Sequence, residues 1–257
     1  MRIQTLILLL ALSTGSVAAI AQAPASAGTV VVKGALVKGK DKRRALDRKR
    51  FYLFKGGLAD NQALIDRVKT AKITSRDCYY VGLKASPCLL AWLREENCET
   101  PFCRVVKRED INGVPEFQAA YDKGLTLYNR KPDIALNWLL NNMSGDLVSG
   151  YYRQQKSLVA TILGDLKPVQ STMTTSTASE ANFVGIATGD KPTKYLISNV
   201  LPVEIDDKSY VWACEVDVQR NKIASIPLAL VLDPKKKNCI QIVNELKACT
   251  AETCNKK

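Results

Sequence analysis

The stretch TVVVKGALVKGKDKRRALDRKRFYLF, residues 29–54, holds two strand-like segments separated by a highly charged one. Its first part, Thr29–Val37, is rich in β-branched side chains, and Arg50–Phe54 alternates aromatic and aliphatic ones. Both compositions favour β-strands. Because two strands alone are only marginally stable in water, we expect this pair to join strands from elsewhere in the chain.

The chain after this stretch is first helical and then rich in strands. Apolar residues at helical spacing follow Asp60, Pro87, Pro115 and Asp133, and a longer stripe runs from Leu147 to Leu163. Ser86 is expected to cap the second helix, with Pro87 in its first turn. Beyond Lys167, short strand patterns occupy residues 169–175, 182–187, 194–198, 209–218 and 226–232. Residues 239–246 fit either a strand or a helix.

This order predicts an α+β fold in which the early strands join the late ones. The expected architecture is an antiparallel β-sandwich built from residues 28–57 and 167–257. A mainly helical, cysteine-containing insertion, residues 58–166, interrupts the sandwich.

The first 21 residues have the three parts of a secretory signal peptide. Arg2 supplies the positive charge, and Leu6–Leu12 forms an apolar run too short to span a bilayer. Ala19-Ile20-Ala21 is the expected cleavage site, with Ala25-Ser26-Ala27 as an alternative. We therefore predict a secreted or periplasmic protein with no integral membrane segment, whose formal net charge falls from +12 to +11 on cleavage.

Export is consistent with the eight cysteines, which we expect to form disulfides. They fall into two groups of four: Cys78, Cys88, Cys98 and Cys103, then Cys214, Cys239, Cys249 and Cys254. Eight cysteines allow about 105 pairings, between which a sequence alone does not choose. A helix from Pro87 would hold Cys88 and Cys98 too far apart to bond. The pairs that fit best are Cys98–Cys103, Cys78–Cys88, Cys249–Cys254 and Cys214–Cys239.

Several catalytic and cofactor sites are excluded by the residues present. Histidine is absent, so a Ser-His-Asp triad, a Cys-His pair or a histidine-bound zinc cannot form. No cysteine pair has C-x-x-C spacing, and we expect neither a metal nor a cofactor. Residues 34–40, GALVKGK, match a nucleotide-binding P-loop except at its last position, where Asp41 replaces the serine or threonine. An acid there would repel phosphate, so this motif is rejected.

Three short patterns resemble the carboxypeptidase regulatory-like (transthyretin-like) β-sandwich family. They are Val32-x-Gly34-x-Leu36, Ala181-x-Phe183-x-Gly185-Ile186 and Lys194-Tyr195-x-Ile197-x-Asn199-x-Leu201-Pro202. The chain departs from the family in its helical insertion and in lacking the acidic-Gly turn before the phenylalanine strand. The resemblance implies an accessory or binding module without catalytic residues of its own.

The charged segment between the two early strands is the candidate contact surface. Its proposed binding residues are Lys42, Arg43, Arg44, Arg48, Lys49 and Arg50. They could bind phosphate, sulfate or carboxylate groups of an envelope polymer, a lipid surface or another exported protein. The alternative is a solvated loop without a ligand. Aromatic residues are not interleaved with the cations, so nucleic acid is not expected.

Two function classes follow from these observations. The first is an exported, disulfide-stabilised, non-enzymatic binding or structural protein that docks anionic cell-envelope components. The second is an extracytoplasmic hydrolase that uses paired carboxylates, for which Glu95-Glu96 and Asp206-Asp207 are candidates. Adjacent acids more often mark solvated turns, and the first class is preferred.

Overall fold

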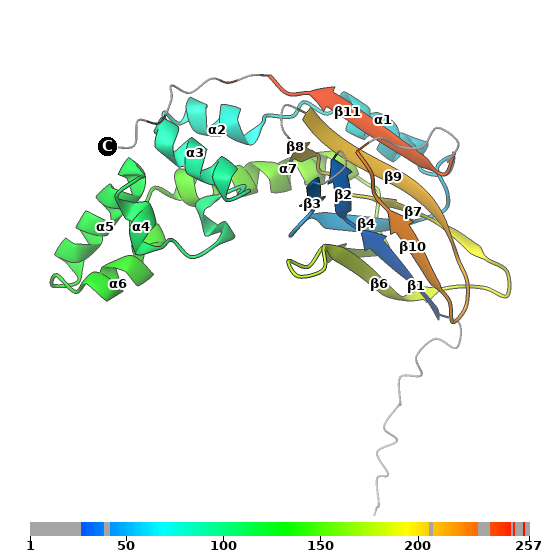
Figure 1. Cartoon of the computed structure of the whole chain (residues 1–257). Helices are drawn as coiled ribbons and strands as arrows, with labels where there is room; N and C mark the ends of the chain where they lie inside the picture. Colours follow the sequence, from blue (N-terminus) through cyan, green and yellow to red (C-terminus); the bar gives the residue numbers. More distant parts are fainter. Residues whose placement is uncertain are drawn as a thin grey trace, which may run out of the picture.

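The computed structural model describes residues 27–38, 42–205, 208–230, 237–247, 249 and 254. The predicted signal peptide lies outside these residues. The fold is α+β, with β-sheets at one end and a group of short helices at the other (Figure 1). Within the described residues, no helix is both long and apolar enough to cross a membrane.

The smaller sheet has three strands in the order β10-β1-β6. These are β10 (Ile223–Pro227), β1 (Ala27–Lys33) and β6 (Glu180–Ala187). β1 is antiparallel to β6, but it is parallel to β10, and at this pair the sheet departs from the predicted antiparallel arrangement. The cause is the turn before β10: Asn221 donates to Ala27 O and Lys222 O accepts from Thr29. β10 therefore begins beside the start of β1 and runs in the same direction.

The larger sheet is antiparallel and has the order β11-β9-β7-β4-β5, with β8 paired to β9. Its strands are β11 (Cys239–Glu245), β9 (Lys208–Val218), β7 (Thr193–Ser198), β4 (Arg50–Lys55), β5 (Gln170–Met173) and β8 (Val203–Ile205). Both early strands pair with later ones, as the sequence predicted: β1 lies between β6 and β10, and β4 between β5 and β7.

The predicted first strand divides at Gly34, which separates β1 from β2 (Ala35–Lys38). A side chain at Gly34 would lie 2.9 Å from the Ser179 carbonyl oxygen, which already accepts the Gly34 N–H at 2.8 Å. Only glycine allows this approach. β2 then pairs with β3 (Lys42–Ala45) in a two-stranded ribbon, so part of the expected charged loop is a strand.

Strand β4 is buried on both faces, which explains its run of large apolar side chains. Phe51 and Leu53 share one hydrophobic cluster with Val30 and Phe183 of the smaller sheet. The alternate residues of β4, Tyr52 and Phe54, pack in a second cluster with α1 (Gln62–Thr70) and α7 (Tyr151–Leu163). The larger sheet therefore lies between the smaller sheet and two helices.

The helical region has its own core, around Tyr80, Leu89, Trp92 and Phe117. Its elements are α2 (Arg76–Gly82), α3 (Pro87–Glu95), η1 (Pro101–Cys103), α4 (Arg108–Ile111), α5 (Pro115–Leu127), α6 (Pro132–Asn137), η2 (Leu139–Asn142) and the π-helical turn η3 (Asp146–Gly150). The predicted cap of α3 is present, because Ser86 Oγ accepts the Leu89 N–H at 3.1 Å. Helices α2 and α4 were not predicted.

The eight cysteines form four disulfides and leave no free thiol. Two expected pairs are present: Cys98–Cys103, and Cys214–Cys239, which face each other on β9 and β11. The expected pairs Cys78–Cys88 and Cys249–Cys254 are wrong. Cys249 instead bonds Cys78 of α2, and Cys254 bonds Cys88 of α3. These two long-range bonds, here called the tail straps, arise because the chain beyond β11 returns to the helical region.

Candidate functional site

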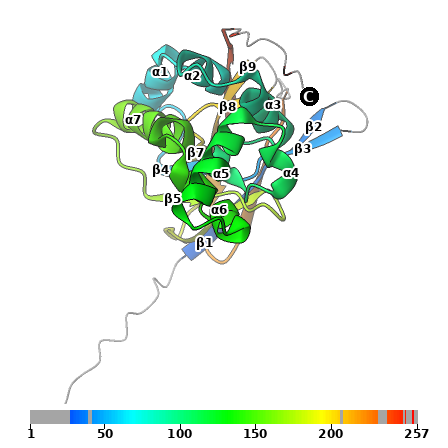
Figure 2. The ribbon, with the colours of Figure 1, turned by 90° about the vertical axis from the view of Figure 1, so that its left-hand side faces the viewer.

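A cleft of about 450 Å³ lies where α7 meets β4 and β5, three elements that Figure 2 shows on the same side of the molecule. Its lining residues come from five places in the chain. They are Arg48, Lys49, Arg50 and Tyr52; Glu99; Tyr152, Gln155, Lys156, Val159, Ala160 and Leu163; Ser171 and Met173; and Leu201, Pro202 and Val203. A volume of this size falls within the range of small-ligand sites, which span about 300–1,000 Å³.

Helix α7 contributes one face to the cleft, because its lining residues recur three and four positions apart. The polar residues among them come first along the helix, and the apolar ones, Val159, Ala160 and Leu163, come last. The helix ends at Gly164, whose φ of +52° is a left-handed conformation suited to glycine. This end leaves Leu163 in the last turn beside the sheet.

Strand β4 places Arg50 opposite Met173 of β5. The guanidinium of Arg50 donates to Ser171 Oγ at 3.2 Å and contacts Met173 Sδ at 3.3 Å. It makes no ion pair with any described carboxylate. The guanidinium of Arg50 therefore places a positive charge on the β5 side of the cleft, and no described carboxylate neutralises it.

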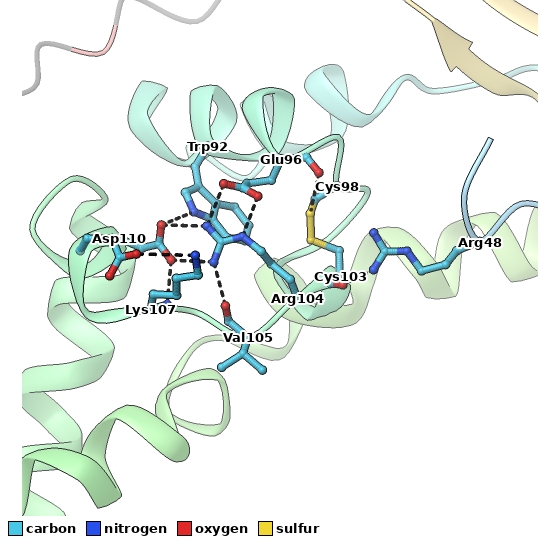
Figure 3. Close-up of polar contacts among 10 residues, drawn as sticks. Arg48, Trp92, Glu96, Cys98, Cys103, Arg104, Val105, Lys107 and Asp110 are labelled. Carbon is cyan, nitrogen blue, oxygen red and sulfur yellow. Dashed lines mark hydrogen bonds and ion pairs between the residues drawn. A yellow bond between two sulfur atoms is a disulfide. The ribbon is translucent and has the colours of Figure 1, made fainter. Parts of the chain in front are cut away.

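Lys49 and Arg48 connect the sheet to the helical region. The Lys49 ammonium forms an ion pair with Glu99, and its backbone N–H donates to Thr174 Oγ1 at 2.9 Å. Arg48, which has a left-handed φ of 57°, donates to the Cys103 carbonyl oxygen (Figure 3). Partial burial would raise the pKa of Glu99, but Lys49, Arg76 and Arg48 more than offset this and hold the pKa below its usual value.

The segment that carries Glu99 and Cys103 is fixed by Arg104. Its guanidinium stacks 4.7 Å from the centre of the Trp92 ring and pairs with Glu96 and Asp110 (Figure 3). Asp110 also accepts the Trp92 indole N–H at 2.9 Å. Hydrogen bonds from Arg104 lower the pKa of Glu96. These contacts, together with the Cys98–Cys103 disulfide, orient the loop that forms one wall of the cleft.

A second, smaller cavity of about 20 Å³ adjoins the cleft at its polar end. Lys49, Glu99, Gln155, Leu201 and Pro202 line both cavities, and Arg76, Asn97, Tyr151 and Glu204 line only the smaller one. Its volume is that of about one water molecule.

Glu204 and Tyr151 form a hydrogen-bonded pair at this smaller cavity. Glu204 Oε1 accepts from the Tyr151 hydroxyl at 2.9 Å and from the Arg76 backbone N–H at 2.8 Å. Burial raises the pKa of Glu204, which has no ion pair with a described cation. Burial also raises the pKa of Tyr151, and the neighbouring Glu204 adds to this.

Gln155 has an unusual position for an amide. Its side chain is 7% exposed and makes no hydrogen bond with the described residues, yet it lines both cavities. The amide therefore faces the space of the two cavities, where a polar group of a ligand could hydrogen-bond with it.

The sequence-predicted binding residues are divided between two places. Arg48, Lys49 and Arg50 line the cleft, whereas Lys42, Arg43 and Arg44 lie on β3 of the ribbon, and their side chains lie outside the described part. Sequence reasoning missed Glu99, Glu204, Tyr151 and Gln155. Only Gln155 carries a signal in the sequence: it stands four residues from Tyr151 and from Val159, on the apolar stripe of its helix.

The predicted carboxylate pairs do not form a catalytic site in the described residues. Glu95 ends α3, and the adjacent Glu96 is held by Arg104. Asp206 and Asp207 lie outside the described residues. Among those residues, no group of three or more histidine, cysteine or acidic side chains is placed to hold a metal ion.

Comparisons with known proteins give little further guidance. No family model and no curated protein sequence matches the chain. Among solved structures, the minor pilin GBS52 of Streptococcus agalactiae aligns with 82% of this chain and 48% of its own, at 12% identity and a TM-score of 0.28. This chain thus spans about half the length of that pilin. A match at this level carries no argument about function.

Proposed function

We propose that the protein is an exported, disulfide-stabilised, non-enzymatic binding protein that docks anionic components of the cell envelope. The observation that carries this proposal is the charge of the cleft lining: Arg48, Lys49, Arg50 and Lys156 stand against Glu99 alone. The excess of positive charge favours an anionic ligand. The four disulfides fit a protein of an oxidising compartment outside the cytoplasm.

We also propose that the two sheets form a β-sandwich that is interrupted by a helical insertion. The hydrophobic cluster that the two sheets share supports this architecture. Membership of the carboxypeptidase regulatory-like family is also proposed, on the residues that suggested it. Such modules present binding surfaces without catalytic groups.

Glu99 and Glu204, the two acids at the smaller cavity, are both held by neighbouring groups, and this favours binding over hydrolysis as the function. Carboxylates that hydrolyse glycosides must face each other across space for the substrate. Here Glu99 is held by Lys49, and Glu204 by Tyr151 and the Arg76 backbone. The cavity between them is about 20 Å³, which holds no sugar ring. The groups act together as a support for the cleft wall.

The test compares two variants that each remove three cations. One replaces the cleft cations (Arg48→Gln, Arg50→Gln, Lys156→Gln), which leaves the Lys49–Glu99 pair intact. The other replaces the ribbon cations (Lys42→Gln, Arg43→Gln, Arg44→Gln). Binding to phosphatidylglycerol vesicles is measured by co-sedimentation at two salt concentrations.

The cleft variant should bind these vesicles about tenfold to hundredfold more weakly, since each cation at a membrane surface contributes about 1 kcal/mol. The ribbon variant should lose less than about threefold. Equal losses would show that the attraction depends on total charge and not on the cleft. If the parent protein binds neither these vesicles nor anionic envelope polymer, the proposed function is wrong.

A further inference from the structure

The cleft is polar at one end and apolar at the other, and this gradient points to the kind of ligand. The end that adjoins the smaller cavity contains the polar residues Lys49, Glu99 and Gln155, together with Leu201 and Pro202. Farther along α7, about one to two helical turns beyond Gln155, the lining consists of Val159, Ala160 and Leu163. A ligand that matches the lining therefore has a charged end and an apolar body.

Three donor groups in the cleft lining have unused capacity to donate hydrogen bonds. Gln155 is buried and makes no hydrogen bond with the described residues. Arg50 and Lys156 make no ion pair with any described carboxylate. A carboxylate could accept from the amide and from the cations at once, since it has two oxygens and accepts only.

The size of the cleft limits the apolar part. At about 450 Å³, it lies in the lower half of the range for small-ligand sites. Tyr52 of β4 and Met173 of β5 add to the apolar wall. This space suits one acyl chain and is small for a lipid with two.

Resting on the proposed function, we propose that the cleft binds a free single-chain amphipathic carboxylate. The carboxylate lies beside Gln155 and Lys156, and the chain extends toward Val159 and Leu163. Met173, a flexible side chain, adapts to the contour of the chain. The surface of the protein would then dock on the envelope while this cleft takes up one monomeric ligand.

The first experiment is calorimetric titration of the full mature protein with decanoate, acetate and 1-decanol. Decanoate should bind with one site per chain. Acetate and 1-decanol should each bind at least about tenfold more weakly, because acetate lacks the apolar body and 1-decanol lacks the charge. From hexanoate to decanoate, the affinity should rise about threefold to fourfold per methylene.

The second experiment places the ligand with matched variants of α7. Ala160→Trp puts a large side chain into the lining, whereas Ser157→Trp puts it on an exposed position that lines neither cavity. Ala160→Trp should weaken decanoate binding at least about tenfold, and Ser157→Trp should leave it unchanged. Gln155→Met keeps the length of the side chain but removes the amide, and should reduce the preference for decanoate over 1-decanol about fivefold.

The outcomes separate this inference from the function on which it rests. If decanoate does not bind while the cleft cations still govern vesicle binding, the ligand class is wrong and the proposed function stands. Equal effects of the two tryptophan variants would show that decanoate binds elsewhere. If neither decanoate nor anionic vesicles bind, both proposals are wrong.

Discussion

The sheets and the helical region are stabilised in different ways. In the sheets, strands of up to 11 residues pair over long sequence distances. Their large side chains pack in two clusters, one between the sheets and one against α1 and α7. The helical region contains helices of 4 to 13 residues around a separate cluster. Isolated helices of this length are marginal in water, so tertiary contacts and covalent bonds must hold them in place.

The disulfides are distributed unevenly between the sheets and the helical region. The bond within the sheets, Cys214–Cys239, joins two residues that are already paired on neighbouring strands. The other three, the two tail straps and Cys98–Cys103, all involve the helical region. The comparison indicates that burial holds the sheets together, whereas the helices depend on covalent ties as well.

Removing both tail straps is expected to have the largest effect. With one strap intact, the other closes a ring of about 15 residues, which should contribute about 3 kcal/mol. Without either, the helical region should lose about 5 kcal/mol or more. We expect the variant with Cys78, Cys88, Cys249 and Cys254 replaced by Ala to lose hydrogen-exchange protection in residues 76–147 while the sheets keep theirs.

The control for this prediction removes Cys98–Cys103, whose cysteines are 5 residues apart. This bond should contribute about 2 kcal/mol, because it closes a short loop. Loss of protection in the sheets and helices together, after removal of the straps, would contradict the division into two regions.

Truncation of one buried phenylalanine in each region should destabilise that region alone. Phe117 of α5 is fully buried and meets Trp92 edge-on at 5.0 Å, and Phe183 of β6 is buried in the sheet cluster. Each Phe→Ala change should cost about 3–5 kcal/mol. By hydrogen exchange, Phe117→Ala should open only the helical region, whereas Phe183→Ala should open both sheets. Identical exchange patterns in the two variants would mean that the protein unfolds as one unit.

A smaller, pH-dependent effect is expected at Glu204, which connects the two regions through Tyr151 and Arg76. Burial raises its pKa, so the folded protein binds this proton more tightly than the unfolded chain does. Stability is therefore lost as the pH rises from the ordinary glutamate pKa through the raised one. Glu204→Gln keeps the accepting oxygen and removes the titration.

Relative to the parent, Glu204→Gln should therefore gain stability across that pH window and be the more stable of the two at neutral pH. Urea unfolding at acidic and neutral pH measures this difference, with the exposed Glu109→Gln as the control. A variant that is less stable than its parent at neutral pH would show that the ionised carboxylate is favourably paired.

The parts of the fold that were predicted depend on local chemistry. Ser86 and Pro87 determine the start of α3 by capping and by the fixed φ of proline, and Arg50–Phe54 forms a strand because its side chains suit burial on a sheet. The unpredicted parts depend on the path of distant segments. Nothing near Cys249 indicates that it meets Cys78, because their contact follows from the route of the chain past β11.

Of the candidate site, the sequence predicted only the residues that belong to a dense run of basic side chains. The cations at residues 48–50 were found this way, although the ribbon cations in the same run lie elsewhere. Glu99 and Glu204 stand in ordinary polar surroundings in the sequence, and only the fold brings them to one cavity. Gln155 was detectable as an amide on an apolar stripe, where a polar side chain is out of place unless it faces a cavity or a polar group.

Backbone amide chemical-shift mapping of the mature protein with decanoate tests most directly whether the cleft beside α7 is the binding site. We expect shift changes concentrated in residues 48–52, 152–163 and 171–173, with the ribbon strands β2 and β3 unaffected. Changes centred on the ribbon, or no changes at saturating decanoate, would contradict this expectation.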